Sequence, residues 1–562
     1  MPFHEQSPTR AVSTLFPPTT PCTVQRLTRP SQLYGNKICK NNGYSPSSFT
    51  YIPIAIIGAG ESGICMGAQL KQQLDFDQFR IFERQSGWGG TWWINRYPGV
   101  ACDVPAAFYS FSFAQNKTWT SLYPPGPEIV KYLDVVCASY GLIDKIQLNT
   151  DVTDCSWNES EQVWDITIHH LVPGMGDLSS ADRAELLEVG GQEAVYTNTE
   201  RIKAKTVISC VGGLVEPNAW PNGVEGKEDF KGQIFHSARW RSDLDFKDKN
   251  VVVVGSGCSA AQFVPELATT YGAKKVTQVM RTPPWVVPKE VMPFGDRGLW
   301  MVAHVPGVAK ALRLIIAAKT EYDWRFFKNG EFNVKEREKE EQRLIKHMKR
   351  ATPEKYHHLL TPNYSIGCKR RIFDAPDGWY NSLNNDKIQL TSKELLKINA
   401  NSVTLGKATY PPGKEGPEEA IEVPADIIVL GNGFKTTQWF HPLKVVGRKG
   451  QTLQEVMDSR GGSQMYMGAA MDQFPNFFTI FGPNTATGHS SVILATENMV
   501  NYTIKLIKPV LAGDARTVEV VEKAELNWAK EIQGKLNDTV WHKGGCQSWY
   551  FDKKGWNSTV YP

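Results

Sequence analysis

The chain has no C-x-x-C motif, and none of its ten cysteines stands close to another in the sequence. Because close cysteine pairs mark zinc sites and disulfide frameworks, we predict reduced thiols and no metal site. The missing C-x-x-C also argues against the dithiol reductases, a class with two nucleotide-binding domains. Three cysteines lie inside motifs described below, and we predict them to be small apolar fillers: Cys102, Cys258 and Cys368.

Long apolar runs and an excess of one charge are also missing. The 62 basic and 58 acidic residues leave a net charge of +4, and no basic block is interleaved with aromatics, which argues against a nucleic-acid partner. No apolar stretch reaches the roughly 18–20 residues that span a bilayer, so no integral membrane segment is expected. The best candidate, residues 302–318, predicts an amphipathic helix packed on the core, with weak peripheral membrane association as the alternative. We expect a cytoplasmic protein.

Residues 1–49 contain five basic residues, a single acid, Glu5, and many Ser, Thr and Pro. The segment lacks the apolar core of a secretion signal. A disordered extension is therefore predicted, with a transit peptide as the alternative.

A short apolar run at residues 52–57 is followed directly by Gly58-Ala59-Gly60-Glu61-Ser62-Gly63. The order of strand, glycine turn and helix is that of a dinucleotide-binding fingerprint. In such a loop Gly58 permits the tight turn, Gly60 lets the backbone approach the pyrophosphate, and Gly63 lets the helix pack against the strand. Glu83 ends the next predicted strand, 20 residues beyond Gly63. An acid there suits the ribose of an adenosine without a 2′-phosphate, so this site is predicted to bind FAD.

A second loop, Gly255-Ser256-Gly257-Cys258-Ser259-Ala260, follows the β-branched run 251–254. The predicted cofactor contacts in it are Gly255, Gly257, Ser259 and Ala260. The next predicted strand, 275–280, leads into Arg281 and Thr282 instead of an acid. A guanidinium binds a 2′-phosphate whereas a carboxylate would repel it, so this second site is predicted to bind NADPH. A solvated arginine at a strand end is the alternative for Arg281.

The two loops predict an α/β fold with two Rossmann-type dinucleotide-binding domains, the second inserted in a discontinuous first. We assign residues 50–225 to the first part of the FAD domain and 226–394 to the NADPH domain, with a helical insert at about 295–365. Residues 395–562 are predicted to be the second part of the FAD domain, and its strands are expected at 426–430 and 477–481.

Two longer patterns accompany the glycine loops. The segment 230–240 has the spacing F-x-G-x-x-x-H-x-x-x-W, filled by Phe230, Gly232, His236 and Trp240. The segment 89–103 has the spacing [A/G]-G-x-W-x₄-[F/Y]-P-[G/M]-x₃-D, filled by Gly89-Gly90-Thr91-Trp92, Tyr97-Pro98-Gly99 and Asp103.

With these patterns the chain resembles the type I Baeyer–Villiger monooxygenases, a branch of the flavin-containing monooxygenase superfamily, over about residues 50–560. The run Cys368-Lys369-Arg370-Arg371 is similar to that of fungal members. The resemblance implies an enzyme of the EC 1.14.13 class that uses FAD, NADPH and O₂. One oxygen would be inserted next to the carbonyl of a small-molecule ketone, through a flavin C4a-peroxide, to give an ester or lactone.

The resemblance also implies roles for single residues. Lys369 would help to hold the NADPH phosphate, and Arg370 would be the catalytic arginine, with Arg371 beside it as the alternative. Asp103 would pair with Arg370 and fix its position, and an ordinary helix cap or ion pair is the alternative for this acid. Trp549 lies in a C-terminal segment that would close over NADP.

Gly90, Thr91 and Trp92 would contact a cofactor, and core packing is the alternative for Trp92 and for Trp549. His236 and Trp240 would couple domain movement to cofactor position, and simple core packing is the alternative for them as well. Asn484 and Thr485 would line the flavin pocket.

The rival activity is that of the N- or S-oxygenating flavin monooxygenases, which would not need Arg370. One departure bears on this choice, because Arg241 follows Trp240 where the ketone-oxidising family commonly has Pro or Asp. By analogy with the family, the substrate would be a bulky cyclic or polyketide-like ketone of secondary metabolism. The sequence leaves the oligomeric state open.

Overall fold

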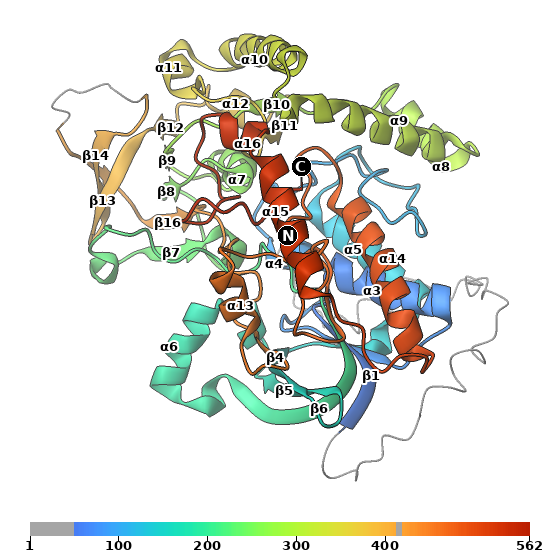
Figure 1. The fold of residues 1–562 in the computed structure, drawn as a ribbon. Coiled ribbons are helices and arrows are strands. Elements are labelled where there is room, and N and C mark those ends of the chain that lie inside the picture. Colours follow the sequence, from blue (N-terminus) through green and yellow to red (C-terminus); the bar gives the residue numbers. More distant parts are fainter. Residues whose placement is uncertain (1–49, 412–418, 562) are drawn as a thin grey trace.

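The computed structural model describes residues 50–411 and 419–561 of the chain. The extension predicted for residues 1–49 lies outside the described residues. Two sheets organise the molecule (Figure 1), and the helices pack on and between them. Each sheet carries one of the glycine loops at the carboxyl end of a central strand.

The first sheet has eight strands, and its central part is parallel. In spatial order the strands are β17 (Lys444–Val446), β4 (Thr150–Asn158), β5 (Val163–Leu171), β6 (Tyr196–Ser209), β1 (Thr50–Ile57), β2 (Phe79–Phe82) and β3 (Ile146–Gln147), with β18 (Phe477–Thr479) paired to β6.

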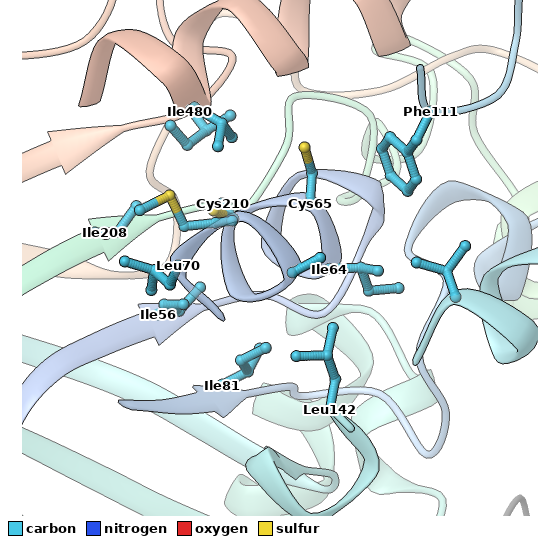
Figure 2. Close-up of a cluster of buried hydrophobic side chains, with 14 of the residues drawn as sticks. Ile56, Ile64, Cys65, Leu70, Ile81, Phe111, Leu142, Ile208, Cys210 and Ile480 are labelled. Carbon is cyan, nitrogen blue, oxygen red and sulfur yellow. The ribbon is translucent and has the colours of Figure 1, made fainter. Parts of the chain in front are cut away.

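Helix α3 (Glu61–Leu74) starts inside the first glycine loop and packs on β1. Figure 2 shows the apolar cluster between them, in which Ile56 of β1, Ile64 of α3 and Ile81 of β2 are fully buried. Helices α5 (Gly126–Ser139) and α14 (Val492–Leu511) contribute residues to the same cluster. This packing holds the amino end of α3 rigidly at the end of β1.

The second sheet has five parallel strands. In spatial order they are β12 (Ile388–Thr391), β9 (Lys275–Val279), β8 (Asn250–Val254), β16 (Ile427–Leu430) and β7 (Gln233–His236). Helix α7 (Cys258–Ala268) starts inside the second glycine loop and packs on β8 through Ala261, Val264 and Leu267.

The order of the strands confirms that one α/β unit is inserted in the other. One strand, however, lies in a different sheet from the one predicted. The run 426–430 was expected in the first sheet, and the structure places β16 between β8 and β7 of the second. The chain returns to the first sheet only at β17, and the run predicted at 477–481 joins it as β18. An apolar strand carries no mark of the sheet it joins, because both sheets bury it on two faces.

The segment predicted as a helical insert is helical. It contains α8 (Gly295–His304), α9 (Val308–Asp323), α10 (Glu331–Ala351) and α11 (His357–Leu360). Helices α8 and α9 extend along the upper edge of the molecule (Figure 1). In the described part of the chain, no single helix is long and apolar enough to cross a membrane. One pair, α8 with the helical stretch Val308–Phe327, is long and apolar enough when the two are taken together, and it is bent by 114°.

The remaining elements are short or peripheral. The strands are β10 (Val286–Pro288) paired with β11 (Ile372–Asp374), and the antiparallel set β13 (Lys393–Asn399), β14 (Ser402–Ala408) and β15 (Ile421–Pro424). The helices are α4 (Thr91–Ile94), α6 (Ser180–Gly190), α12 (Trp379–Ser382), α13 (Leu453–Ser459), α15 (Glu522–Leu536) and α16 (Val540–Lys543).

Candidate active site between two glycine loops

The first glycine loop is closed by backbone on two sides. Gly58 has φ of +103°, and a Cβ there would lie 2.5 Å from the carbonyl oxygen of Cys210. A Cβ on Gly63 would lie 1.9 Å from the carbonyl oxygen of Gly58. Only glycine fits either position, so the strand, turn and helix of the predicted fingerprint are present as expected.

Glu83 ties the end of β2 to this loop. Its carboxylate accepts hydrogen bonds from the backbone N–H of Ala59 at 2.7 Å and of Gln85 at 2.8 Å. Burial raises the pKa of Glu83, and the two backbone donors oppose that effect. The acid lies at the strand end predicted for it, and its contact with a ribose stays a prediction.

The segment around Gly90 packs directly on the first loop. The Gly89 N–H donates to the carbonyl of Ala59 at 2.9 Å, and a Cβ on Gly90 would lie 2.9 Å from the Cα of Gly60. Exposed Thr91 begins α4 here, and Trp92 contacts the apolar cores of both domains. The long pattern therefore joins the first nucleotide loop to the domain boundary.

Trp92 begins a chain of hydrogen bonds that was not predicted from the sequence. Its indole donates to the Tyr109 hydroxyl at 3.1 Å, which donates to the carboxylate of Glu61 at 3.0 Å. Burial raises the pKa of Glu61 to about 7, and the hydrogen bond from Tyr109 lowers it in part. Glu61 lies inside the fingerprint as one of its variable positions, so the motif gave no signal for it.

The second glycine loop is more open than the first. Gly255 has φ of +124°, and a Cβ there would lie 2.3 Å from the carbonyl oxygen of Gly431. A Cβ on Gly257, in contrast, would meet nothing within 4 Å. Ala260 is buried under the loop, and Ser259 lies in the first turn of α7. The Tyr97 hydroxyl of the first domain donates to the side chain of Gln262 on the same helix at 2.9 Å.

A cationic cluster lies beside the second loop. Lys369 donates to the hydroxyl of Thr282 at 2.7 Å, and it lies close enough to Arg281 for the two charges to interact. Burial, and then the charge of Arg281, lowers the pKa of Lys369 to about 8. Two cations and a hydroxyl from segments 87 residues apart thus converge, as a 2′-phosphate site requires.

Asp103 and Arg370 form an ion pair across the two domains, which confirms the predicted pairing. The charge of Asp103 raises the pKa of Arg370. The side chain of Arg370 still keeps 48% of its surface open. Arg371 points elsewhere, with its guanidinium over the rings of Phe327 and Phe373.

Cys368 and Cys546 form a disulfide, which corrects the prediction of reduced thiols and of Cys368 as an apolar filler. The two residues are 178 positions apart, so their spacing carried no signal, and only the packing of the C-terminal segment on the Lys369–Arg371 segment brings them together. Cys102 and Cys258 are free, and Cys102 is buried as expected.

The disulfide holds the C-terminal segment beside the ion pair. Buried Tyr550 lies near Arg370 and Arg371, and these charges counter part of the rise that burial gives its pKa. Trp549 next to it is 39% exposed, and its backbone carbonyl accepts from the Thr436 hydroxyl at 3.0 Å. The exposed indole is free to contact a cofactor or to move.

The residues of the 230–240 pattern lie before, on and after β7, at the edge of the second sheet. A Cβ on Gly232 would lie 2.2 Å from the carbonyl of Asp426, and Phe230 packs in the apolar cluster nearby. Burial, and then the charge of Arg239, lowers the pKa of His236 to about 4. Trp240 stacks on Phe246 with ring centroids 5.5 Å apart. Its packing matches the structural alternative, and the gating role stays a prediction.

Asn484 and Thr485 bond within the protein. The Asn484 amide donates to the carbonyls of Asn557 at 2.8 Å and Val560 at 3.0 Å, so it holds residues 557–560 in place. The Thr485 hydroxyl donates to the carbonyl of Gly482 at 2.6 Å.

Comparison with known proteins agrees with this geometry. Residues 177–299 match the flavin-binding monooxygenase-like family, and residues 56–124 match the NAD(P)-binding Rossmann-like domain. A Baeyer–Villiger monooxygenase of Pseudomonas aeruginosa is 31% identical over 535 residues, which cover 95% of this chain and 92% of that protein. This chain belongs to the Baeyer–Villiger monooxygenases. The FAD-binding monooxygenase ktnD of Aspergillus niger is 32% identical over 91% of this chain and 79% of its own length.

Solved structures share the Baeyer–Villiger monooxygenase fold. An oxidised steroid monooxygenase bound to NADP superimposes with a TM-score of 0.71 at 24% identity, over 89% of this chain and 93% of that one. A cyclohexanone monooxygenase from Rhodococcus sp. Phi1 bound to NADP⁺ gives a TM-score of 0.71 at 21% identity, over 92% and 94%. The predicted architecture of two nucleotide-binding domains is therefore confirmed.

Proposed function

We propose that this chain uses FAD and NADPH to insert one oxygen atom of O₂ next to the carbonyl of a small-molecule ketone, which yields an ester or lactone. The observation that carries the proposal is the ion pair of Asp103 and Arg370 at the meeting of the two domains. Asp103 belongs to the segment that follows the first glycine loop, and Arg370 lies beside Cys258 at the start of α7.

The residues present fit both cofactors. The amino ends of α3 and α7 point into the two glycine loops, where free N–H groups and the helix dipole favour a pyrophosphate. The space beside Gly257 admits a close backbone contact, and Arg281, Thr282 and Lys369 would hold the 2′-phosphate of NADPH. When bound and reduced by NADPH, FAD would activate O₂, which supplies the inserted oxygen atom.

Arg370 would bind the anionic oxygen that attacks the ketone and the oxyanion that follows. A guanidinium keeps its proton at all working pH values, and Asp103 raises its pKa further. It therefore supplies a permanent charge without donating the proton that would quench the attacking anion. Asp103 acts as a positioning residue, because its carboxylate fixes the direction of the guanidinium.

The C-terminal segment at 546–550 would close over NADP and exclude water from this site. Its support is the disulfide from Cys546 to Cys368 and the hydrogen bond from Thr436 to the Trp549 carbonyl. The disulfide attaches the segment beside Lys369 and Arg370, and the hydrogen bond attaches it to the chain after β16. The exposed indole of Trp549 would cover a bound nicotinamide there.

The test compares Arg370→Ala with Arg371→Ala in the FAD-loaded enzyme. Products from a panel of cyclic ketones and from an aryl methyl sulfide are measured together with the rate of flavin reduction by NADPH. We expect Arg370→Ala to lose at least about a hundredfold in ester formation, the usual effect of removing an oxyanion-stabilising group, and to keep flavin reduction. Arg371→Ala is the matched control, because its guanidinium packs on aromatic rings.

Two results would contradict the assignment. Loss of ester formation in Arg371→Ala alone would move the catalytic role to the neighbouring arginine. A wild-type enzyme that oxidises the sulfide and none of the ketones, with a rate unaffected by Arg370→Ala, would favour the N- or S-oxygenating activity.

A further inference from the structure

Gln262 of α7 joins the two domains near the ion pair of Asp103 and Arg370. Its side-chain amide N–H donates to the backbone carbonyl of Ala101 at 2.9 Å, and its amide oxygen accepts from the Tyr97 hydroxyl at 2.9 Å. A backbone carbonyl can only accept, so the contact with Ala101 fixes which end of the amide faces each partner. Both partners belong to the domain of the first glycine loop, whereas α7 begins in the second loop.

The chain around Gly99 lies directly on α7. Gly99 has φ of +77°, and a Cβ there would lie 2.6 Å from the carbonyl oxygen of Gln262 and 3.0 Å from the Cγ of Glu266. The buried ring of Tyr97 packs edge-on against Phe263 of the same helix, with ring centroids 5.7 Å apart. No side chain fits between this segment and α7, so the two hydrogen bonds of Gln262 are made across a tightly packed contact.

Within its own domain, the segment that carries Asp103 is held by backbone contacts. Ala101 pairs with Pro125 as an isolated β-bridge. The next residue, Cys102, donates its backbone N–H to the carbonyl of Pro124 at 2.9 Å. The carbonyl of Ala101 is also the group that accepts the hydrogen bond from α7, and Asp103 follows two residues later. A shift of Ala101 relative to α7 would therefore move Asp103 with it.

The segment of the other charge also contacts α7. The thiol of Cys258, the first residue of the helix, donates to the backbone carbonyl of Arg371 at 3.6 Å. Burial raises the pKa of this thiol, and the nearby charge of Arg370 lowers it in part. Cys258 and Gln262 are four residues apart, a spacing that puts them on one face of the helix. One face of α7 thus contacts the segments that carry both members of the ion pair.

We propose that Gln262 is a positioning residue for the oxygen insertion. It holds the Asp103 segment on α7, and through Asp103 it sets the direction of the Arg370 guanidinium. This role rests on the proposed function, and it links the ion pair to the helix whose amino end would bind NADPH. Without the amide, each segment keeps its own contacts but loses its register with the other, and an error of about 1 Å at a reacting group can cost about a hundredfold in rate.

The test compares Gln262→Met with the wild type as full-length, FAD-loaded enzymes, with NADPH and a panel of cyclic ketones. Methionine keeps the length of the side chain but cannot donate a hydrogen bond to the Ala101 carbonyl. We expect kcat for ester formation to fall about 10–100-fold while KM for NADPH and for the ketone changes less than about threefold. NADPH that is oxidised without ester formation should reduce O₂ to hydrogen peroxide. Tyr97→Phe removes the hydroxyl alone and should lower kcat about fivefold, the usual effect of one hydrogen bond.

A double-mutant cycle with Asp103→Asn separates positioning from general support of the domain boundary. If Gln262 acts through Asp103, Gln262→Met should change kcat less than about twofold in the Asp103→Asn background. An equal loss in both backgrounds overturns the proposal, because Gln262 then acts without Asp103. So does a KM for NADPH raised about tenfold at unchanged kcat, which makes Gln262 part of cofactor binding. Tyr97→Phe takes the place of Gln262→Met in the cycle if the latter does not fold.

The matched control is Gln73→Met, the same change on α3. The Gln73 amide donates to the side chains of Gln69 at 2.6 Å and Asn501 at 2.7 Å, and its loss should leave kcat as in the wild type. FAD content and a thermal melt show that each variant is folded. Wild-type kcat in Gln262→Met, where Asp103→Asn lowers ester formation, overturns the positioning role alone. A wild type that forms ester from none of the ketones overturns the proposed function, and the positioning role with it.

Discussion

The two glycine loops share a motif but differ in how tightly the protein closes around them. In the first loop, the third glycine touches backbone, since a Cβ on Gly63 would lie 1.9 Å from the carbonyl of Gly58. In the second, Ala260 takes the third position, and a Cβ on Gly257 would meet nothing within 4 Å. The strand-end residue differs in the same sense, because Glu83 is buried and bonded to backbone whereas Arg281 is exposed.

This difference matches two kinds of cofactor use. A closed loop with a buried acid suits a nucleotide that is bound once and retained, as FAD would be. An open loop beside a cationic cluster suits a nucleotide that must enter and leave, as NADPH and NADP⁺ would in every cycle. Glycine-to-alanine variants in the two loops can therefore test whether closure or motif identity decides retention.

The largest effect is expected from Gly63→Ala. The new Cβ cannot fit against the Gly58 carbonyl, so α3 must shift, at a cost of about 3 kcal/mol, and the purified protein should contain no FAD. The change Gly257→Ala, at the second glycine of the other loop, adds a Cβ in open space and should leave FAD content and thermal stability unchanged while weakening NADPH binding. Flavin absorbance per protein and a thermal melt measure both. Equal FAD loss in the two variants would contradict the comparison.

The next effect concerns the cationic cluster of Arg281, Thr282 and Lys369. Arg281→Ala and Lys369→Ala are each expected to lower the preference for NADPH over NADH by about 10–100-fold, the usual worth of a hydrogen bond to a charged group. The readout is kcat/KM of flavin reduction with each coenzyme. Lys275→Ala, on the same strand β9 but before its end, is the control and should keep the preference.

The same cluster predicts a pH dependence. The pKa of Lys369 is lowered to about 8, so its charge is lost as pH rises through 8, and kcat/KM for NADPH should fall there while that for NADH stays flat. Removal of the neighbouring charge in Arg281→Ala should move this alkaline fall to higher pH. An alkaline fall that stays in place in Arg281→Ala would show that another group controls it.

How far the sequence predicts this molecule depends on whether a feature is local. Strand, glycine turn and helix are adjacent in the chain, so Gly58 to Gly63 and Gly255 to Ala260 could be assigned directly. The pairing of Asp103 with Arg370 followed from a family resemblance and not from spacing. Glu61 with Tyr109, the Cys368–Cys546 disulfide and the sheet of β16 depend on segments brought together only by the tertiary fold, and no pattern within one segment encodes them.

A moderate effect is expected when the disulfide is removed. Cys368→Ser/Cys546→Ser should lower the free energy of unfolding by about 2–4 kcal/mol and raise KM for NADPH severalfold, because the Trp549 segment loses its covalent attachment. Flavin content should stay unchanged, since the first loop makes no contact with the disulfide. Cys155→Ser, a buried free cysteine in β4, is the control for the loss of a thiol. An unchanged KM would argue against a closing role for the segment.

The smallest effect tests whether closing the first loop forces a buried carboxyl group to stay neutral. The carboxyl of Glu61 lies in the first turn of α3, where the FAD pyrophosphate would lie, and its pKa is raised to about 7. Because the folded state favours the neutral acid, the stability of the apoprotein should fall as pH rises from about 4.5 to about 7 and stay level above that range. FAD affinity should decrease severalfold as pH rises through about 7, where the carboxyl of the folded protein loses its proton and a carboxylate replaces a neutral donor beside the phosphates. Glu61→Gln should flatten both profiles, and the exposed Glu228→Gln should leave them as in the wild type. If the pH dependence persists in Glu61→Gln, it belongs to Glu83, the other buried acid of this loop. The unfavourable burial of a carboxyl group would then lie beside the predicted ribose and not beside the predicted pyrophosphate.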